Sequence, residues 1–559
     1  MRWTPFLLLG LAGCDAGFQA IDARVDSLMA QASGGLGSEA TPPTPQPWAE
    51  VDATPDAMIN PKPFTVNPPS ESLVLTPAPP QDGEAIADAL SEAASMLETE
   101  AQPLSMDQAV RWAAEHSREY QFARYDYLST SLTLLSELHL WGPRFSNTVS
   151  STLDAAGTSG AYDTALSVIN DFSATHRLPQ GGEVSASILT SVTSDIHTAV
   201  TSSDAQSSTM ALAASVPLLA GAGIVARESL IQDQRNLVYA ARNFERFRRT
   251  FFRSLVGDYL DLVVQRQALG NAERGVESLR QLARRQQALY DAGRARLYAS
   301  ADAENQALAS IARLSQSWER YRLAIDRFKV RIGWPIDSAI RIEPASLSLV
   351  PPEVDPGQAV IESLLYRLDL QNTRDSVEDA ERAVENARNG LLPDLDLTAS
   401  VSVPTKSDRV ADFNTGDANF EVGAVLELPL DRETQRLAVR QSQITLERAR
   451  RNERVARDTV AVDVRSALRD IEVFQFSLDL QERNVEIARL GLDSINADPD
   501  RVSVLDQTRA ISELQDARDA RDAAKRDLDL AILDYLLQAG QLRITPRGTM
   551  IPIRGIVVP

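Results

Sequence analysis

Residues 389–404 read NGLLPDLDLTASVSVP and, after a polar loop, residues 419–431 read NFEVGAVLELPLD. The next stretch, from Arg432 to Arg489, contains no proline or glycine. Roughly 60 helical residues at about 1.5 Å each measure about 90 Å, which is longer than a globular domain is thick. The sequence therefore predicts a β-hairpin connected to a very long helix. Apolar residues recur in this helix at spacings of three and four, the period of one helix face, at Val460, Val464, Leu468, Ile471, Phe474 and Leu478.

The same order of patterns occurs earlier in the chain. A helical pattern begins after Ser105, its predicted N-cap, and ends at Gly142–Pro143, because proline lacks the amide donor that a helix needs. Four stretches between Pro143 and Pro217 show the two-residue alternation of β-strands. They are 145–153, 165–174, 183–193 and 208–216, and we expect polar residues on one face, among them Ser185, Ser187, Thr190 and Thr193.

A second long helical pattern follows these strands. It breaks at Asp291–Ala292–Gly293, and another helix then ends at Gly333–Trp334–Pro335. Heptads sustained over this length predict packing of the coiled-coil kind. The repeating positions are Leu230, Leu237, Phe244 and Phe251, and, on a neighbouring stripe, Leu255, Leu262 and Leu269.

Helix, hairpin, long helix, break and helix thus occur twice, which indicates an internal duplication. Pro143 and Pro217 are 74 residues apart, whereas Pro393 and Pro429 are 36 apart. The first copy therefore holds 38 more residues, enough for one more hairpin. We predict a first repeat at 105–345 (hairpins 143–217, long helix 221–290, helix 298–332) and a second at 357–544 (hairpin 393–429, long helix 431–495, helix 502–539), with a C-terminal tail at 545–559.

The first residues have the layout of a secretory signal, predicted at 1–13: a positive start at Met1–Arg2 and then a short apolar segment. The string Leu11–Ala12–Gly13–Cys14 resembles the lipobox of bacterial lipoproteins, so we expect a lipid on the Cys14 thiol; an ordinary signal with a chance cysteine is the alternative. Asp15 leaves open whether such a lipoprotein is sorted to the outer or the inner membrane. The proline-rich composition of residues 14–102 predicts an extended tether.

Composition narrows the possible partners. The net charge of −21 argues against nucleic acid, whose phosphates require clustered positive charge. Beyond Cys14 no run of 18 apolar residues offers a transmembrane helix. The four histidines are scattered and the one cysteine belongs to the predicted anchor, so we expect no metal site, no other cofactor and no enzymatic activity.

From Ser105 to Ile544 the chain resembles the TolC family of outer-membrane efflux ducts. The resemblance rests on the order of several strings: GLLPDLDLTASVS, VPLLAGAGIVARESL, LPLDRETQRLAVRQS, LYDAGRARLYASADAENQ and PDRVSVLDQTRA. It implies an α+β membrane protein with two internal repeats per protomer. Three protomers would share one outer-membrane β-barrel, continued into the periplasm by an α-helical coiled-coil barrel. Closing a barrel also removes the open strand edges that lipid does not tolerate.

The resemblance also implies partners and sites. The protein would be a passive export conduit for small molecules or proteins, working with a periplasmic adaptor and an inner-membrane pump in a tripartite efflux or type I secretion system. The turns at Gly293, Arg294 and Arg501 would contact the adaptor. Asp506 and Arg509 would line the periplasmic constriction, although Asp506 could equally be a solvated helix-start acid. The alternative function is a non-conducting coiled-coil spacer lipoprotein that kept only the helices.

Overall fold

The computed structural model describes residues 18–34, 101–158, 161–197, 205–347, 349–406, 409–497, 502–545 and 550. Cys14 and Arg501 lie outside the described residues. The chain divides into two compact units, which we describe in turn. The first comprises Met1–Gly37, Asp126–Asn243 and Asp369–Arg457, and the second comprises Ser38–Tyr125, Phe244–Leu368 and Asp458–Pro559.

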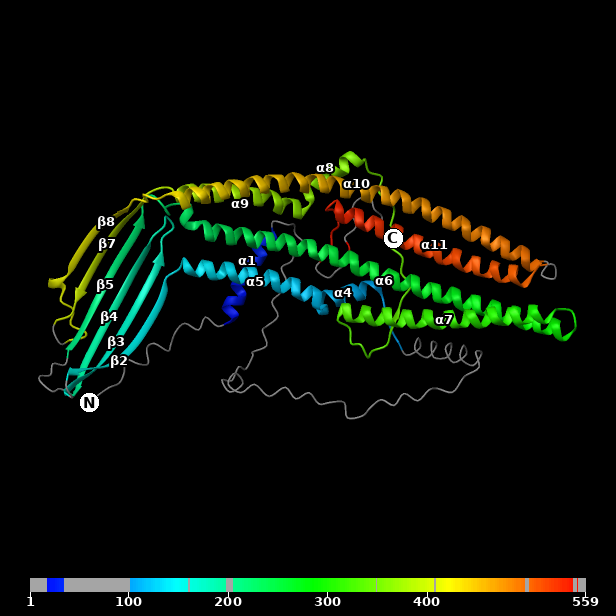
Figure 1. Cartoon of the computed structure of the whole chain (residues 1–559), viewed down its shortest axis with the longest axis horizontal. Helices are drawn as coiled ribbons and strands as arrows, with labels where there is room; N and C mark the ends of the chain where they lie inside the picture. The colour runs from blue at the N-terminus through cyan, green and yellow to red at the C-terminus, as the bar shows by residue number, and fades with distance from the viewer. Residues whose placement is uncertain are drawn as a thin grey trace. The chain divides into compact units, whose positions relative to one another are not determined.

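The first unit contains one six-stranded antiparallel sheet, with its strands side by side in the order β2-β3-β4-β5-β7-β8 (Figure 1). Four strands come from the predicted hairpins of the first copy and two from the hairpin of the second. The extra 38 residues therefore form strands of the same sheet. The strands are β2 (Arg144–Thr158), β3 (Ala161–Arg177), β4 (Glu183–His197), β5 (Ala205–Pro217), β7 (Asp394–Pro404) and β8 (Asn419–Glu427).

The two faces of this sheet differ in chemistry, because paired residues of antiparallel strands point to the same side. One face, here called the apolar face, carries large hydrophobic side chains from every strand, and the opposite face, the polar face, carries mainly hydroxyl and acidic groups. The apolar face comprises Phe145, Val149, Leu153, Leu166, Val168, Phe172, Ile188, Val192, Met210, Leu212, Val401, Val403, Phe420 and Val422. The polar face includes Ser146, Thr148, Ser150, Asp171, Ser173, Ser185, Ser187, Ser191, Thr193, Ser207, Thr209, Ser400, Ser402 and Glu421.

One residue that we assigned to the polar face is on the other side. Thr190 is an odd number of positions from Ser185, Ser187 and Thr193, so strand alternation turns its side chain to the apolar face. There it accepts a hydrogen bond from the Ser208 hydroxyl at 2.9 Å. This pairing within the sheet satisfies a hydroxyl that would otherwise be isolated among apolar side chains.

Helix α1 (Phe18–Gly34) also belongs to the first unit, and it lies within the stretch for which the sequence predicted an extended tether. Val25, Met29 and Ser33 are buried along one face of it, at the four-residue spacing of helical neighbours. The Tyr127 hydroxyl, on α5 (Arg118–Leu140), donates a hydrogen bond to the Met29 carbonyl at 3.1 Å. The proline-rich composition around this stretch hid its short amphipathic pattern.

Long helices contribute to both units: α6 (Glu228–Asp291) and α10 (Glu433–Ala497) have 64 and 65 residues. The second unit adds α7 (Leu297–Ile332), α11 (Val504–Gln538) and the short α4 (Met106–His116) and α8 (Pro356–Tyr366), and α9 (Leu368–Asn389) follows α8. The hydrophobic core of this unit joins α4, α6, α7, α10 and α11. Predicted heptad and helix-face positions lie in the buried interior of the chain, namely Leu237, Phe244, Phe251, Leu255, Leu262, Leu269, Val460, Val464 and Ile471.

A two-stranded parallel pair in the second unit was not predicted. Strand β1 (Gln102–Leu104) pairs with β6 (Ile340–Ile342), and so connects the segment just before the predicted first repeat to the end of that repeat. The hydroxyl of the fully buried Tyr259 lies 2.8 Å from the carbonyl oxygens of both Leu104 and Glu343 and donates to them from α6. Three-residue strands are too short to leave an alternation signal in the sequence.

The first helix of each copy, predicted as continuous, is interrupted by one extended residue. Ser117 separates α4 from α5 and Arg367 separates α8 from α9, with ψ angles of 127° and 118°. Neither position is next to a proline or glycine, the usual sequence signals of a helix break. The Arg367 guanidinium bonds Asp463 at 2.8 Å and Gln538 at 3.1 Å, so tertiary contacts stabilise the second interruption.

A glycine ends the last helix of each copy in the left-handed region. Gly333 has φ 74° and Gly540 has φ 70°. A Cβ on Gly333 would overlap the carbonyl of His116, the last residue of α4, and a Cβ on Gly540 would lie 3.0 Å from the carbonyl of Tyr366, the last residue of α8. The same close approach therefore occurs once in each predicted repeat.

Candidate functional site

The two turns that connect the paired helices of the second unit contain the residues predicted to contact an adaptor. In the first turn, between α6 and α7, Gly293 has φ 68° and its amide donates to the Tyr290 carbonyl at 2.8 Å. The Arg294 amide donates to the Leu289 carbonyl at 2.8 Å. Gly293 and Arg294 are both exposed, and a Cβ on Gly293 would meet no atom within 4 Å. Backbone conformation, and not close packing, explains the glycine.

The second turn leads into α11, where Ser503 is the N-cap. Its hydroxyl accepts a hydrogen bond from the Asp506 amide at 3.2 Å and donates one to the Asp506 carboxylate at 2.6 Å. A carboxylate in the first helical turn is also stabilised by the helix dipole. Asp506 is exposed while it makes these contacts, so the structure gives it a capping role without removing it from water.

Arg509 lies one turn further along α11 and is paired with Glu513 at 2.9 Å. The side chains of Arg509 and Glu513 are 76% and 59% exposed, so this ion pair contributes little to stability. Asp506 and Arg509 are thus both surface groups of the helix start, with partners at the N-cap and on α11 respectively.

Below the turns a small apolar cluster holds α6, α7 and α11 together. Leu279 and Leu282 of α6 pack with Ala307 of α7, and Val504 and Ile511 of α11 lie against them. The Ser300 hydroxyl of α7 donates to Gln287 of α6 at 2.6 Å. The candidate site therefore consists of exposed polar turns supported by a packed base.

The numbering of α7 and α11 shows how the first acid of each helix is placed. Gly333 and Gly540 differ by 207 positions, and so do Ala299 and Asp506. The same offset pairs Asp302 with Arg509. The first acid of the predicted first repeat thus lies one helical turn later than that of the second.

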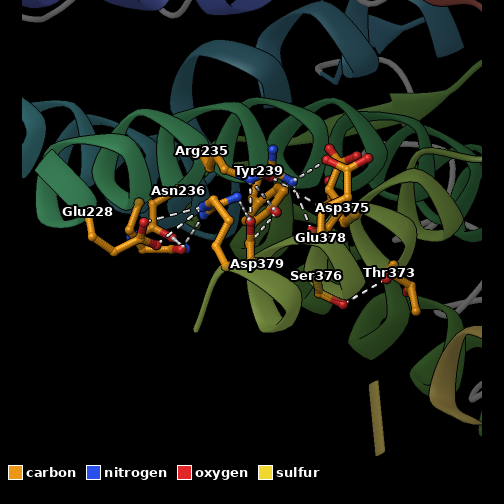
Figure 2. A network of polar contacts seen from close by, with 12 residues as sticks. Glu228, Arg235, Asn236, Tyr239, Thr373, Asp375, Ser376, Glu378 and Asp379 are labelled. Atoms are coloured by element: carbon orange, nitrogen blue, oxygen red, sulfur yellow. Dashed lines mark hydrogen bonds and ion pairs between the residues drawn. The ribbon is translucent and has the colours of Figure 1, made fainter. Parts of the chain in front are cut away.

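In the first unit, a row of polar contacts joins α6 to α9 (Figure 2). Arg382 contacts Glu228 at 3.3 Å and Gln232 at 3.2 Å. Arg235 is ion-paired with Asp379, and the Tyr239 hydroxyl donates to the same carboxylate at 2.5 Å. We call this set the α6–α9 seam. Because these contacts follow one another along both helices, they fix the position of one helix along the other.

Burial raises the pKa of Tyr239 to about 12, and its hydrogen bond to Asp379 adds to the increase.

In the second unit, burial lowers the pKa of the Arg249 guanidinium, against the opposing effect of Glu245. Glu245 accepts from Arg248 at 2.7 Å and from Arg249 at 2.9 Å, and these arginines also donate to backbone carbonyls at Gly540 and Thr545. The network holds residues 540–545, which follow α11, against α6.

Within the described ranges we found no cluster of three or more His, Cys, Asp or Glu residues placed to hold a metal ion. Among the described helices, none is both long and apolar enough to cross a membrane.

Comparison with known proteins agrees with this architecture. The family model described as outer membrane efflux protein matches residues 360–543. The outer membrane efflux protein BepC of Brucella suis biovar 1 (strain 1330) is 25% identical over 329 residues, covering 58% of this chain and 68% of BepC. The fold is similar to that of the Campylobacter jejuni CmeC outer membrane channel (TM-score 0.60, 14% identity, 78% of this chain and 85% of CmeC). It is equally similar to VceC of Vibrio cholerae (TM-score 0.60, 15% identity, 78% of this chain and 96% of VceC). The matches in sequence and in fold confirm the resemblance of this chain to the TolC family of outer membrane efflux proteins.

Proposed function

We propose that three copies of this chain form the outer-membrane conduit of a tripartite efflux or type I secretion system. The sheet is the observation that carries the proposal. Its apolar face is exposed at both edges, where Phe145 is 71% and Val422 is 78% exposed, while its other face is rich in hydroxyl groups. A wall between lipid and a water-filled lumen requires this alternation. CmeC, named as an outer membrane channel, has a similar fold, and BepC, named as an outer membrane efflux protein, is similar in sequence.

The long helices of both repeats would form the periplasmic part of the conduit. Their polar and charged surfaces suit an aqueous path, and an inner-membrane pump would supply the energy. Cys14, four residues before α1, would carry the lipid that anchors each copy to the outer membrane. Mass spectrometry of the mature N-terminus would reveal an acylated cysteine there, and an unmodified cysteine would contradict the anchor.

The tip turns would serve the partner proteins. Gly293, Arg294 and Arg501 would contact a periplasmic adaptor, since short exposed turns between paired helices offer side chains and backbone groups to another helical hairpin. Asp506 and Arg509 would stand at the constriction of the trimer, with three copies of each. A ring of carboxylates favours cations in a pore, and a ring of guanidinium groups opposes them.

Planar-bilayer recording of the purified full-length protein tests the conduit. Wild type is expected to conduct, with a cation preference that falls in Asp506→Asn and rises in Arg509→Gln, as measured by reversal potentials in a salt gradient. Asp302→Asn is the matched control in α7, where a carboxylate lies one helical turn later than Asp506 does in α11. A smaller change in Asp302→Asn than in Asp506→Asn would support Asp506 as the constriction.

The alternative is a non-conducting spacer, and the same recording separates it from a conduit. Protein that folds as trimers but gives no conductance, even with Asp506→Ala and Arg509→Ala together, would refute the conduit. Equal reversal potentials in all variants would leave a conduit whose constriction lies elsewhere than at Asp506 and Arg509.

A further inference from the structure

The number of strands has a consequence for the size of the outlet. The second repeat contributes one hairpin to the sheet and the first contributes two, so each chain supplies six strands. We infer that three copies close an 18-stranded barrel, three times six strands, whose lumen is wide enough for partly folded polypeptide. The inference rests on the proposed trimeric conduit and adds its width and the class of cargo that fits.

Pairing shows that all strands of the first repeat belong to one continuous wall. Strand β2 pairs with β3 without interruption from Arg144↔Thr175 to Thr158↔Ala161. Strand β3 pairs with β4 from Arg177↔Glu183 to Thr164↔His197, with a single irregularity at Thr164/Ala165. A hairpin that folded away from the sheet would lack this register with β4.

The chemistry of the faces also continues through the additional hairpin. Phe145, Val149 and Leu153 of β2 lie on the same face as Phe420 and Val422 at the opposite edge. All five side chains are more than 60% exposed. If the β2–β3 hairpin were folded into an aqueous lumen, the three β2 side chains would be in water at a cost of about 1.5–3 kcal/mol for each large side chain. Lipid contact along the whole apolar face avoids that cost.

The turn between β3 and β4 packs closely against its neighbours at one end of the sheet. Gly181 and Gly182 have φ 99° and 87°. A Cβ on Gly182 would overlap the Ser215 carbonyl, and the Gln180 carbonyl accepts a hydrogen bond from the Gly223 amide at 2.8 Å. The turn thus packs closely against the segment that connects β5 to α6, so the hairpins of the first repeat share one rigid base.

The edges of the sheet are suited to a second copy of the chain. In the described part of the chain, β2 and β8 each pair with one neighbouring strand. Six antiparallel strands give edges of opposite direction, so β8 of one copy can pair antiparallel with β2 of the next. Unpaired backbone groups cannot remain in hydrocarbon, where each costs several kcal/mol. Closure through further copies satisfies both edges at once.

Strand spacing and tilt set the width. With strands about 4.8 Å apart and tilted about 40°, 18 strands enclose a backbone diameter of about 36 Å, and 12 strands about 24 Å. Side chains take about 5 Å from each wall, half the distance between packed sheets. The remaining lumen of about 26 Å admits a pair of packed helices, about 20 Å across, whereas about 14 Å admits only one helix. The tip, and not the barrel, would then limit the size of the cargo.

Disulfide crosslinking tests the wall without shortening the chain. The pair Ser150→Cys on β2 and Glu421→Cys on β8, together with neighbouring polar-face positions Ser146, Thr152 and Val425, should link copies into dimers and trimers on oxidation. The control pairs Ser187→Cys on β4 with the same β8 cysteines, and native Cys14 is kept throughout. Links from β4 in place of β2 would show that the β2–β3 hairpin lies outside the wall and would overturn the inference. Links from neither strand would refute the shared barrel itself.

Polymer exclusion measures the width. Deletion of residues 161–204 removes β3 and β4 and leaves β2 and β5, which run in opposite directions, as a single hairpin. With polyethylene glycols added on the barrel side of a bilayer, wild type should admit polymers of about 1.9 times the hydrodynamic radius that the deletion variant admits, the ratio of the two lumen widths. Equal cut-offs in two conducting proteins would contradict the inference while leaving the conduit intact. Absence of conductance in wild type would refute the conduit instead.

Discussion

The two predicted repeats of this chain agree where their helices pack together and differ at the sheet and at the tip. Ser117 and Arg367, which interrupt the first helices, are 250 positions apart, as are Pro143 and Pro393 before the strands. Gly333 and Gly540 close the last helices against equivalent partners. At the sheet, however, one repeat has four strands and the other two. At the tip, Arg296 precedes α7 without a side-chain cap, whereas Ser503 caps α11.

This difference separates two kinds of constraint. Positions that agree are those where backbones approach closely and a changed residue would disturb packing. Positions that differ are exposed turns and strands, where a substitution or insertion costs little and changes what the surface binds or how wide it is. The comparison thus identifies the sheet and the tip as the parts that determine how wide the conduit is and what it binds.

The strongest test of the agreement is to add a methyl group at the two closing glycines. Gly333→Ala and Gly540→Ala would each place a Cβ in a left-handed backbone and against a carbonyl group. We expect a loss of about 3 kcal/mol for Gly333→Ala, with its tighter approach, and about 2 kcal/mol for Gly540→Ala. Thermal unfolding followed by circular dichroism measures both.

Gly491 supplies the matched control. It lies inside α10, and a Cβ there would meet no atom within 4 Å. Gly491→Ala should therefore stabilise the helix by about 0.5–1 kcal/mol. If Gly333→Ala or Gly540→Ala behaved like this control, the corresponding close approach would not exist, and the agreement between the repeats would be lost at that point.

The sequence predicts individual helices and strands well where periodicity carries the information. Val460, Val464 and Ile471 repeat at helical spacing and are buried in α10. The strands alternate, and their positions were recognisable. The interruption at Arg367 was not, because it depends on Asp463 and Gln538, which are distant in sequence. The tip residues stay a prediction, since exposure and capping alone assign Asp506 no role in a pore.

The difference at the tip can be tested by exchanging caps. Ser503→Ala removes the acceptor of the Asp506 amide and should cost about 1 kcal/mol. Arg296→Ser offers the uncapped start of α7 an acceptor and should gain up to about 1 kcal/mol. Hydrogen exchange of the first-turn amides should become faster in α11 and slower in α7. Unchanged exchange in both helices would mean that the caps do not distinguish the two tips.

The smallest expected effect concerns the α6–α9 seam, which joins the two repeats near the sheet. The Tyr239 hydroxyl donates to Asp379, and the folded pKa of Tyr239 is about 12 against an ordinary value of 10.0. The folded state therefore holds this proton more tightly, so stability is full below pH 10 and declines as the pH rises through 12. Tyr239→Phe cannot titrate, and its melting temperature should fall less between pH 10 and 12 than that of wild type. Tyr290→Phe, at an exposed tyrosine on the same helix outside the seam, controls for the general effect of losing a phenol. If wild type and Tyr239→Phe declined in parallel, the seam would be too exposed to favour the neutral phenol. The register of α6 on α9 would then depend on the other contacts between the helices, among them those of Arg235, Arg242 and Arg382.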